Sequence, residues 1–172
     1  MLLRVVRRLA KVAEPVVVVA AEGQLLPVLP SGVAVARDVR PAAGPLEGIR
    51  VGLEALASEV DRAFVASCDA PLLVPQFVRA VADRLGAADV AVPCDEHHAH
   101  CLAGVYRVSV APVIDALLEQ GIRRPIALFD QVPSRRIDVD ELRHADPDLT
   151  SLRNVNTPEA YQALLQQFDF SD

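Results

Sequence analysis

The chain has 172 residues, 52% of them hydrophobic and 4% aromatic, so it can form one domain with a core of valine, alanine and leucine. Its formal net charge of −6 argues against a nucleic-acid-binding protein, which would usually be basic, but not against one nucleotide held through a metal ion. No apolar run approaches the roughly 18 residues of a membrane span. The three cysteines lack paired spacing, which fits a reducing cytoplasm better than a disulfide framework.

The first third of the chain is predicted to contain two helices and two strands. Helices are predicted at residues 2–13 and 45–58, and strands at 16–21 and 33–37. The first helix begins without an N-cap residue and ends at Pro15, and the strand that follows it is too short for a signal peptide. Gly44 frees the backbone before the second helix, and Pro45 suits its first turn.

The rest of the chain continues to alternate between strands and helices. Strands are predicted at 64–66, 89–93, 102–108 and 135–139, helices at 74–85, 109–120, 125–132 and 158–168, and a loop at 140–151. Ser109 and Thr157 are predicted as N-caps, and Gly121 is predicted to end a helix. This alternation predicts an α/β fold with a doubly wound, mainly parallel sheet in a single domain over residues 1–172.

A lone carboxylate, Asp69, directly follows the buried strand at 64–66, and Pro71 prevents that strand from continuing. Ligands of open α/β sheets bind at the carboxyl ends of the strands, and magnesium is commonly held there by one or two carboxylates. Asp69 is therefore a candidate metal ligand in a nucleotide site. The alternative interpretation is an aspartate that closes a turn before a proline.

Two further patterns each allow a functional and a structural interpretation. Gly48 and Gly52 lie one turn apart inside a helix, which indicates close approach of a ligand or of another backbone, or else plain helix–sheet packing. Asn154 and Asn156 share one side just before a helix N-terminus, where side-chain amides suit phosphate oxygens. They are alternatively turn and cap residues.

The segment 94–101 contains two cysteines and three histidines, but its spacing does not match the paired ligands of a structural zinc site. We expect a solvent-exposed loop there and no metal. The arginine pairs at 123–124 and 135–136 could contact phosphate, although isolated pairs of this kind are usually solvated.

Three motifs together resemble those of the molybdenum cofactor guanylyltransferases. They are Gly-Pro-Leu-Glu-Gly at 44–48, Cys-Asp-Ala-Pro at 68–71 and Asn-Val-Asn-Thr-Pro-Glu at 154–159. The resemblance implies a Rossmann-like nucleotidyltransferase fold in which a molybdopterin phosphate attacks the α-phosphate of GTP and releases pyrophosphate. It implies nucleotide contacts at Asp38, Gly44, Leu46 and Gly48, catalysis and Mg²⁺ binding at Asp69, and a pterin and phosphate side at Asn154 and Asn156.

The chain departs from this family at its start. The family opens with a strand and a glycine-rich phosphate loop, and nothing in this sequence matches them. Either the start codon is assigned too late or the chain is a real remnant without catalysis, and the first helix without a cap favours truncation. As written, the chain is expected to lack the first strand and phosphate loop, to be marginally stable, to self-associate and to have no transferase activity. The alternatives are a cytidylyltransferase or sugar-phosphate nucleotidyltransferase relative, or a non-catalytic binding remnant.

Overall fold

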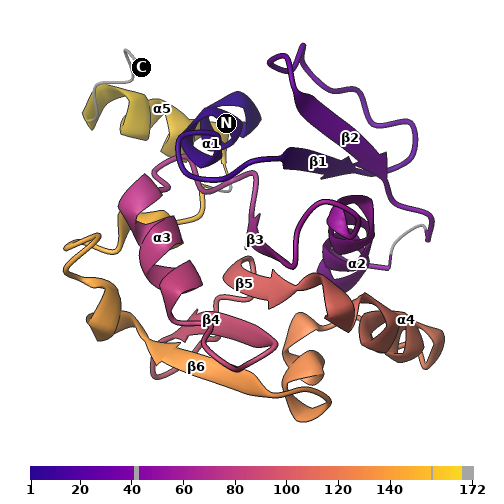
Figure 1. Ribbon diagram of the computed structural model, residues 1–172. Helices are drawn as coiled ribbons and strands as arrows, with labels where there is room; N and C mark the ends of the chain where they lie inside the picture. The colour runs from indigo at the N-terminus through magenta and orange to yellow at the C-terminus, as the bar shows by residue number, and fades with distance from the viewer. Residues whose placement is uncertain (41–42, 156, 168–172) are drawn as a thin grey trace.

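The computed structural model describes residues 1–40, 43–155 and 157–167, which form a layered α/β arrangement (Figure 1). The helices are α1 (Leu2–Leu9), α2 (Pro45–Leu56), α3 (Pro75–Asp83), α4 (Ala111–Glu119) and α5 (Pro158–Gln167). The strands are β1 (Val16–Ala20), β2 (Val33–Arg37), β3 (Arg62–Ala66), β4 (Val90–Cys94), β5 (Ala103–Arg107) and β6 (Ser134–Asp138). Short 3-10 helices occupy Val108–Val110, Pro125–Asp130, Val139–Leu142 and Thr150–Leu152.

The strands form two separate sheets. β1 pairs with β2 in parallel, and the second sheet has the order β3-β5-β4-β6. β5 runs antiparallel to both β3 and β4, whereas β4 and β6 are parallel. The α/β class is thus confirmed, but one mainly parallel sheet is not what the structure shows. The connection between β4 and β5 contains no crossover helix, so β5 folds back beside β4 as an antiparallel neighbour.

The larger sheet is buried on both faces. On β4, Val90 and Val92 belong to a hydrophobic cluster with α2 and α4, whereas Ala91 belongs to a cluster with α1 and α3. β3 alternates in the same way, because Ala63 and Val65 pack against the first cluster while Phe64 and Ala66 pack against the second. Helices therefore cover opposite faces, as a strand period of two requires.

The two sheets are connected through α2 rather than through a hydrogen-bonded ladder. Within the described residues, β1 pairs only with β2 and β3 pairs only with β5. α2 packs against both β1 and β3, and a Cβ on Gly52 would lie 3.3 Å from Val19 Cγ2. Helix–sheet packing thus accounts for Gly52. The expectation of an absent first strand concerns this gap between β1 and β3, and it stays a prediction.

Local sequence signals fixed several helix ends. Gly44 adopts a φ of 77° directly before α2, Gly121 adopts 78° after α4, and the Thr157 hydroxyl accepts the Ala160 N–H at 3.1 Å, so the Thr157 cap is confirmed. The Ser109 cap is wrong: Ser109 lies within the 3-10 helix before α4, and α4 has no side-chain cap. No helix in the described part of the chain is both long and apolar enough to cross a membrane.

Candidate active site

Asp69 lies in the turn that follows β3, on the side of the sheet where β3 ends. Its backbone carbonyl accepts a hydrogen bond from the Val155 N–H at 2.8 Å. Its side-chain Oδ1 is buried and has no hydrogen-bond partner among the residues that the structure describes. An acceptor in this state costs free energy unless a ligand satisfies it, so Asp69 has the property expected of an ion ligand.

Asp38 has the same property at the end of β2. Its backbone N–H donates to the Ala20 carbonyl at 3.0 Å, while Oδ1 of its side chain is buried and, within residues 1–40, 43–155 and 157–167, has no hydrogen-bond partner. Burial raises the pKa of the Asp38 carboxyl, the nearby Glu47 carboxylate raises it further, and the Arg50 guanidinium opposes both. A cation at Asp38 would relieve this unfavourable environment.

The donor set at these two strand ends fits magnesium. Mg²⁺ prefers oxygen ligands and is commonly bound through one or two carboxylates together with phosphate oxygens of a substrate. Asp69 and Asp38 each present a buried carboxylate oxygen that the described protein atoms leave unsatisfied. No described trio of His, Cys, Asp or Glu could hold a metal by itself, so a cation here would need ligand oxygens as well.

At the start of α2, a ligand could contact backbone atoms rather than side chains. Gly44 is exposed, and a Cβ there would lie 3.7 Å from the carbonyl oxygen of Arg123. The Leu46 side chain has 0% exposure and belongs to the core, so a ligand at this helix end would contact the backbone of Leu46. Gly48 has open space beside it, because a Cβ there would meet no atom within 4 Å.

A buried charge network holds the Asp38 loop against α2. Arg50 donates to both carboxylate oxygens of Glu47 at 2.8 Å, and the two side chains have 6% and 1% exposure. Glu47 also accepts the Val39 N–H at 3.3 Å and an Arg40 N–H at 3.3 Å. No role was predicted for Glu47 from the sequence, although its i,i+3 spacing to Arg50 indicates an ion pair on one helix face.

A cavity of about 600 Å³ brings three of the predicted segments together. Pro45 of the glycine–proline motif, Ala70 beside Asp69, and Asn154 all line it. Its other polar lining residues include Arg124, His98 and His100. Arg124 was predicted to be solvated and the two histidines to lie in an exposed loop, whereas the structure places all three in the cavity with Asn154. Asn156 lies outside the described residues.

A set of hydrogen bonds fastens the segment before Asn154 to the Asp69 turn. The Ser151 hydroxyl accepts the Val74 N–H at 2.9 Å, and the Thr150 hydroxyl donates to the Leu72 carbonyl at 3.4 Å. Asp146, with 3% exposure, accepts the backbone N–H groups of Thr150 and Ser151. These hydrogen bonds thus fix the position of the segment before Asn154 relative to the turn that contains Asp69, although the two are far apart in sequence.

The loop between β4 and β5 is organised around Asp95. Its carboxylate accepts the backbone N–H groups of His97 and His98 and contacts His100 Nε2 at 2.9 Å, and these contacts hold its pKa below the usual range. Burial raises the pKa of the Cys101 thiol to about 11, so this sulfur is a poor metal ligand at neutral pH. The predicted absence of zinc stays a prediction.

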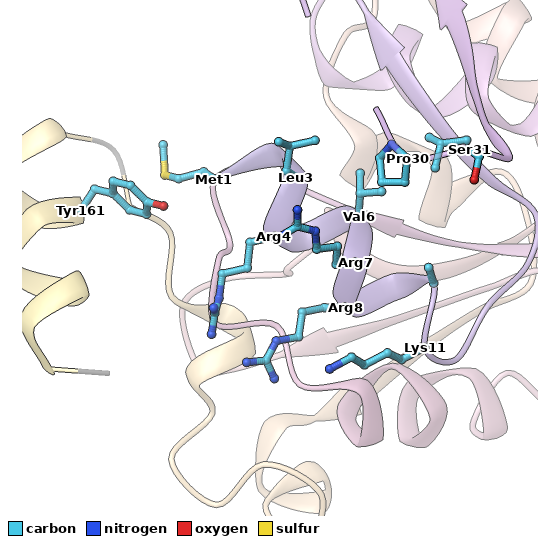
Figure 2. A pocket seen from close by; sticks show the side chains of 12 residues that line it. Met1, Leu3, Arg4, Val6, Arg7, Arg8, Lys11, Pro30, Ser31 and Tyr161 are labelled. Carbon is cyan, nitrogen blue, oxygen red and sulfur yellow. The ribbon is translucent and has the colours of Figure 1, made fainter. Parts of the chain in front are cut away.

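Another pocket, of about 590 Å³, lies on the outer side of α1 (Figure 2). Figure 2 shows four basic side chains of the α1 region on one wall, with the 30–31 loop and Tyr161 of α5 at its borders. The basic residues are Arg4, Arg7, Arg8 and Lys11. None of the predicted site residues that the structure describes lines this pocket, so it is separate from the strand-end site.

The sequence is similar to that of known proteins. A family model described as the MobA-like NTP transferase domain matches residues 1–135. The chain is 39% identical over 155 residues to a probable molybdenum cofactor guanylyltransferase from Mycobacterium tuberculosis, covering 88% of this chain and 72% of the relative. A protein of the same name from Carboxydothermus hydrogenoformans is 32% identical over 136 residues, covering 79% of this chain and 68% of the relative.

Solved structures share the fold. The molybdopterin-guanine dinucleotide biosynthesis protein A from Archaeoglobus fulgidus matches with a TM-score of 0.67 at 22% identity, over 78% of this chain and 69% of that one. A putative protein from Aquifex aeolicus matches with a TM-score of 0.60 at 26% identity, over 73% of this chain and 63% of that one. The chain therefore belongs to the MobA-like NTP transferase family and is a nucleotidyltransferase like the molybdenum cofactor guanylyltransferases.

Proposed function

We propose that the protein transfers the GMP moiety of GTP to the terminal phosphate of molybdopterin cofactor. A phosphate oxygen of the acceptor forms a bond to the α-phosphorus of GTP, and the bond from that phosphorus to the β-phosphate oxygen breaks, which releases pyrophosphate. The observation that carries the proposal is the pair of buried, unsatisfied carboxylate oxygens of Asp69 and Asp38 at two strand ends. Its support is the relatives' names at 39% and 32% identity.

Asp69 and Asp38 are the residues we propose to hold Mg²⁺. The ion would supply positive charge to the phosphate oxygens as charge develops on them. The Glu47–Arg50 pair fixes the Asp38 loop through Val39, so these two residues are positioning residues. The hydrogen bond from Val155 to Asp69 fixes the other carboxylate turn.

The N-terminus of α2 is the proposed nucleotide side of the site. Free backbone N–H groups at the start of a helix favour anionic ligands, and the carboxylate of Glu47 is turned toward Arg50 and Arg40. Gly44 and Gly48 leave room for a ligand to approach the backbone of this turn. The buried side chain of Leu46 packs beneath it.

The cavity of about 600 Å³ is the proposed acceptor side. Arg124 supplies a permanent positive charge to it, and His98 and His100 supply further N–H groups that suit a phosphate. Asn154 lines the same cavity beside the Asp69 turn, and we assign Asn156 to this side on the motif alone. An acceptor bound here would place its phosphate next to Asp69.

Pyrophosphate release with molybdopterin and Mg²⁺ tests the proposal, with GTP and CTP compared at equal concentration. This proposal departs from the expectation of lost activity that the missing phosphate loop suggested. We expect release that depends on GTP and on Mg²⁺, and that falls on the order of a hundredfold in Asp69→Ala. Faster release with CTP would favour the cytidylyltransferase alternative. Tight GTP binding without any release would favour the non-catalytic alternative.

We also propose that residues 1–172 act as one domain and work in the cytoplasm. Cys68, Cys94 and Cys101 are all free thiols, which supports a reducing compartment.

A further inference from the structure

A second cavity adjoins the proposed acceptor cavity. It has a volume of about 560 Å³, and it shares four lining residues with the acceptor cavity of about 600 Å³, which are His98, Ala99, Arg124 and Ile126. From these residues the acceptor cavity extends to Asn154 and to the turn that contains Asp69. The second cavity, called the outer cavity below, extends instead to Glu96 in the loop after β4 and to Arg136 on β6. A long ligand with one end beside Asp69 would therefore have its other end in the outer cavity.

The loop after β4 supplies a carboxylate, that of Glu96, to the outer cavity. The neighbouring Asp95 carboxylate accepts the backbone N–H groups of His97 and His98 at 2.8 Å each, and the Asp95 N–H donates to the His98 carbonyl at 3.0 Å. These bonds fix the backbone on both sides of Glu96 without using its side chain. Glu96 is exposed and has no hydrogen-bond or ion-pair partner among the residues that the structure describes, so its carboxylate is available to a ligand.

Arg136 supplies a guanidinium to the same cavity. It lies on β6, where its register partner is Val92 of β4, and its guanidinium carbon lies 5.6 Å from the centroid of the Phe129 ring. Because this guanidinium is held over an aromatic ring, it loses less freedom when it binds a ligand. Ile126 lines both cavities and is 38% exposed, so it offers an apolar surface near the two charged groups.

These side chains together suit a flat heterocycle that carries hydrogen-bond donors on one edge. A carboxylate accepts two parallel N–H groups as a bidentate pair, a guanidinium donates to a ring carbonyl, and an apolar side chain packs against the face of the ring. A 2-amino-4-oxopyrimidine ring has all of these features, because its ring N–H and its amino group point the same way and its carbonyl lies next to them. Pterins and guanine both contain this ring.

We propose that the outer cavity binds the pterin ring of the acceptor, with Glu96 accepting its ring N–H and 2-amino group and Arg136 donating to its 4-oxo group. Arg124, which lines both cavities, would lie between the pterin and the phosphate. We commit to the pterin rather than to guanine because none of the described residues of the Asp38 loop or of α2 lines the outer cavity. The inference rests on the proposed function, since it takes the acceptor phosphate to lie beside Asp69.

The test measures the binding of two fluorescent probes to the 172-residue protein without nucleotide. One is 6-hydroxymethylpterin phosphate, and the other is the matching lumazine phosphate, which carries an oxygen in place of the 2-amino group and is otherwise the same. The chain contains no tryptophan, so no tryptophan emission overlaps the signal of the probes. We expect saturable binding of the pterin and about tenfold or more weaker binding of the lumazine, because its 2-oxo group would face the Glu96 carboxylate.

Glu96→Gln provides the first protein variant, and because Glu96 is exposed we expect it to keep the melting temperature of the wild type. It should lose the preference for pterin over lumazine. Glu119→Gln makes the same change at the exposed end of α4, outside both cavities, and should keep the preference. Arg136→Met keeps an apolar side chain beside Phe129 and should weaken the binding of both probes alike, because both carry the 4-oxo group.

Four results would overturn the proposal. The first is the absence of saturable pterin binding to the wild type, and the second is equal affinity for the two probes. The third is a preference for pterin that persists in Glu96→Gln. The fourth is displacement of the pterin probe by guanosine at concentrations as low as those of the pterin itself, which would identify guanine as the occupant.

The outcome is distinguishable from that of the proposed transferase function. A preference for pterin that depends on Glu96, without any release of pyrophosphate, would support the pterin site and contradict the transferase activity. Release of pyrophosphate with molybdopterin, without any preference for pterin over lumazine, would support the transferase activity and contradict the pterin site.

Discussion

The backbone N–H of Val155 donates a hydrogen bond of 2.8 Å to the carbonyl oxygen of Asp69. This contact joins the turn after β3 to the segment that carries Asn154, although 86 positions of sequence, 69 to 155, separate the bonded residues. The Ser151 hydroxyl and the buried Asp146 carboxylate reinforce the junction. These hydrogen bonds of Val155, Ser151 and Asp146 therefore set the geometry of the candidate site together with the carboxylates of Asp69 and Asp38.

Ser151→Ala is expected to destabilise the protein by about 1–2 kcal/mol, because it leaves the Val74 N–H without its acceptor. The same substitution at the exposed Ser109, on the short helix before α4, should change the unfolding free energy by less than about 0.5 kcal/mol. Urea unfolding followed by circular dichroism measures both. Equal urea midpoints for Ser151→Ala and Ser109→Ala would show that the hydrogen bond between Ser151 and Val74 adds no stability.

Glu47→Gln should destabilise the protein by about 2 kcal/mol, since it removes the charge that two Arg50 hydrogen bonds require. Arg50 keeps its contact with Glu54 at 2.6 Å, so the loss stays below that of an isolated buried charge. Glu54→Gln, at a carboxylate with 52% exposure, is the matched control and should cost less than about 1 kcal/mol. A larger loss in Glu54→Gln than in Glu47→Gln would contradict this ranking.

Acid should weaken the same network. The hydrogen bonds from Arg50 hold the pKa of Glu47 below its ordinary value of 4.5, so the ionised form is favoured by folding. This contribution is fully present above pH 4.5 and is lost as the pH falls through the lowered pKa of the folded state. Urea midpoints measured between neutral pH and pH 3 should therefore fall less steeply in Glu47→Gln than in the wild type. Parallel curves would exclude Glu47 as a source of the acid sensitivity.

The loop between β4 and β5 should contain no stoichiometric zinc. The Asp95 carboxylate is already engaged by His97, His98 and His100, and burial keeps the Cys101 thiol protonated. Elemental analysis of protein purified without added metal should give well under one zinc per chain. One tightly held zinc that disappears in His100→Ala would reverse this interpretation.

Local signals in the sequence predicted local structure well. Gly44 and Pro45 fixed the start of α2, and Thr157 fixed the start of α5, because each acts on backbone geometry within a few residues. The N-cap predicted at Ser109 was wrong, because Ser109 does not stand directly before the helix. The backbone forms a 3-10 turn there, and the helix begins two residues later without a side-chain cap.

Non-local pairing could not be predicted in the same way. A strand was predicted at 102–108, where β5 lies, but its antiparallel direction depends on how the Asp95 loop folds back. The division into two sheets depends on which strands pair with β1 and β3, and the residues within each strand do not determine this pairing. The nucleotide contact at Leu46 stays a prediction, and the burial of its side chain in the core, which depends on the tertiary packing of α2, limits that contact to its backbone.

The central claim is that Asp69 holds a divalent cation at the nucleotide site, and metal affinity tests it most directly. Mn²⁺ is titrated into the protein in the presence of GTP, and the free ion is measured by electron paramagnetic resonance. We compare the wild type with Asp69→Asn and with Asp83→Asn, an exposed position on α3. The account predicts affinity lower by more than about tenfold in Asp69→Asn and unchanged in Asp83→Asn. Equal Mn²⁺ affinity in all three proteins would contradict it.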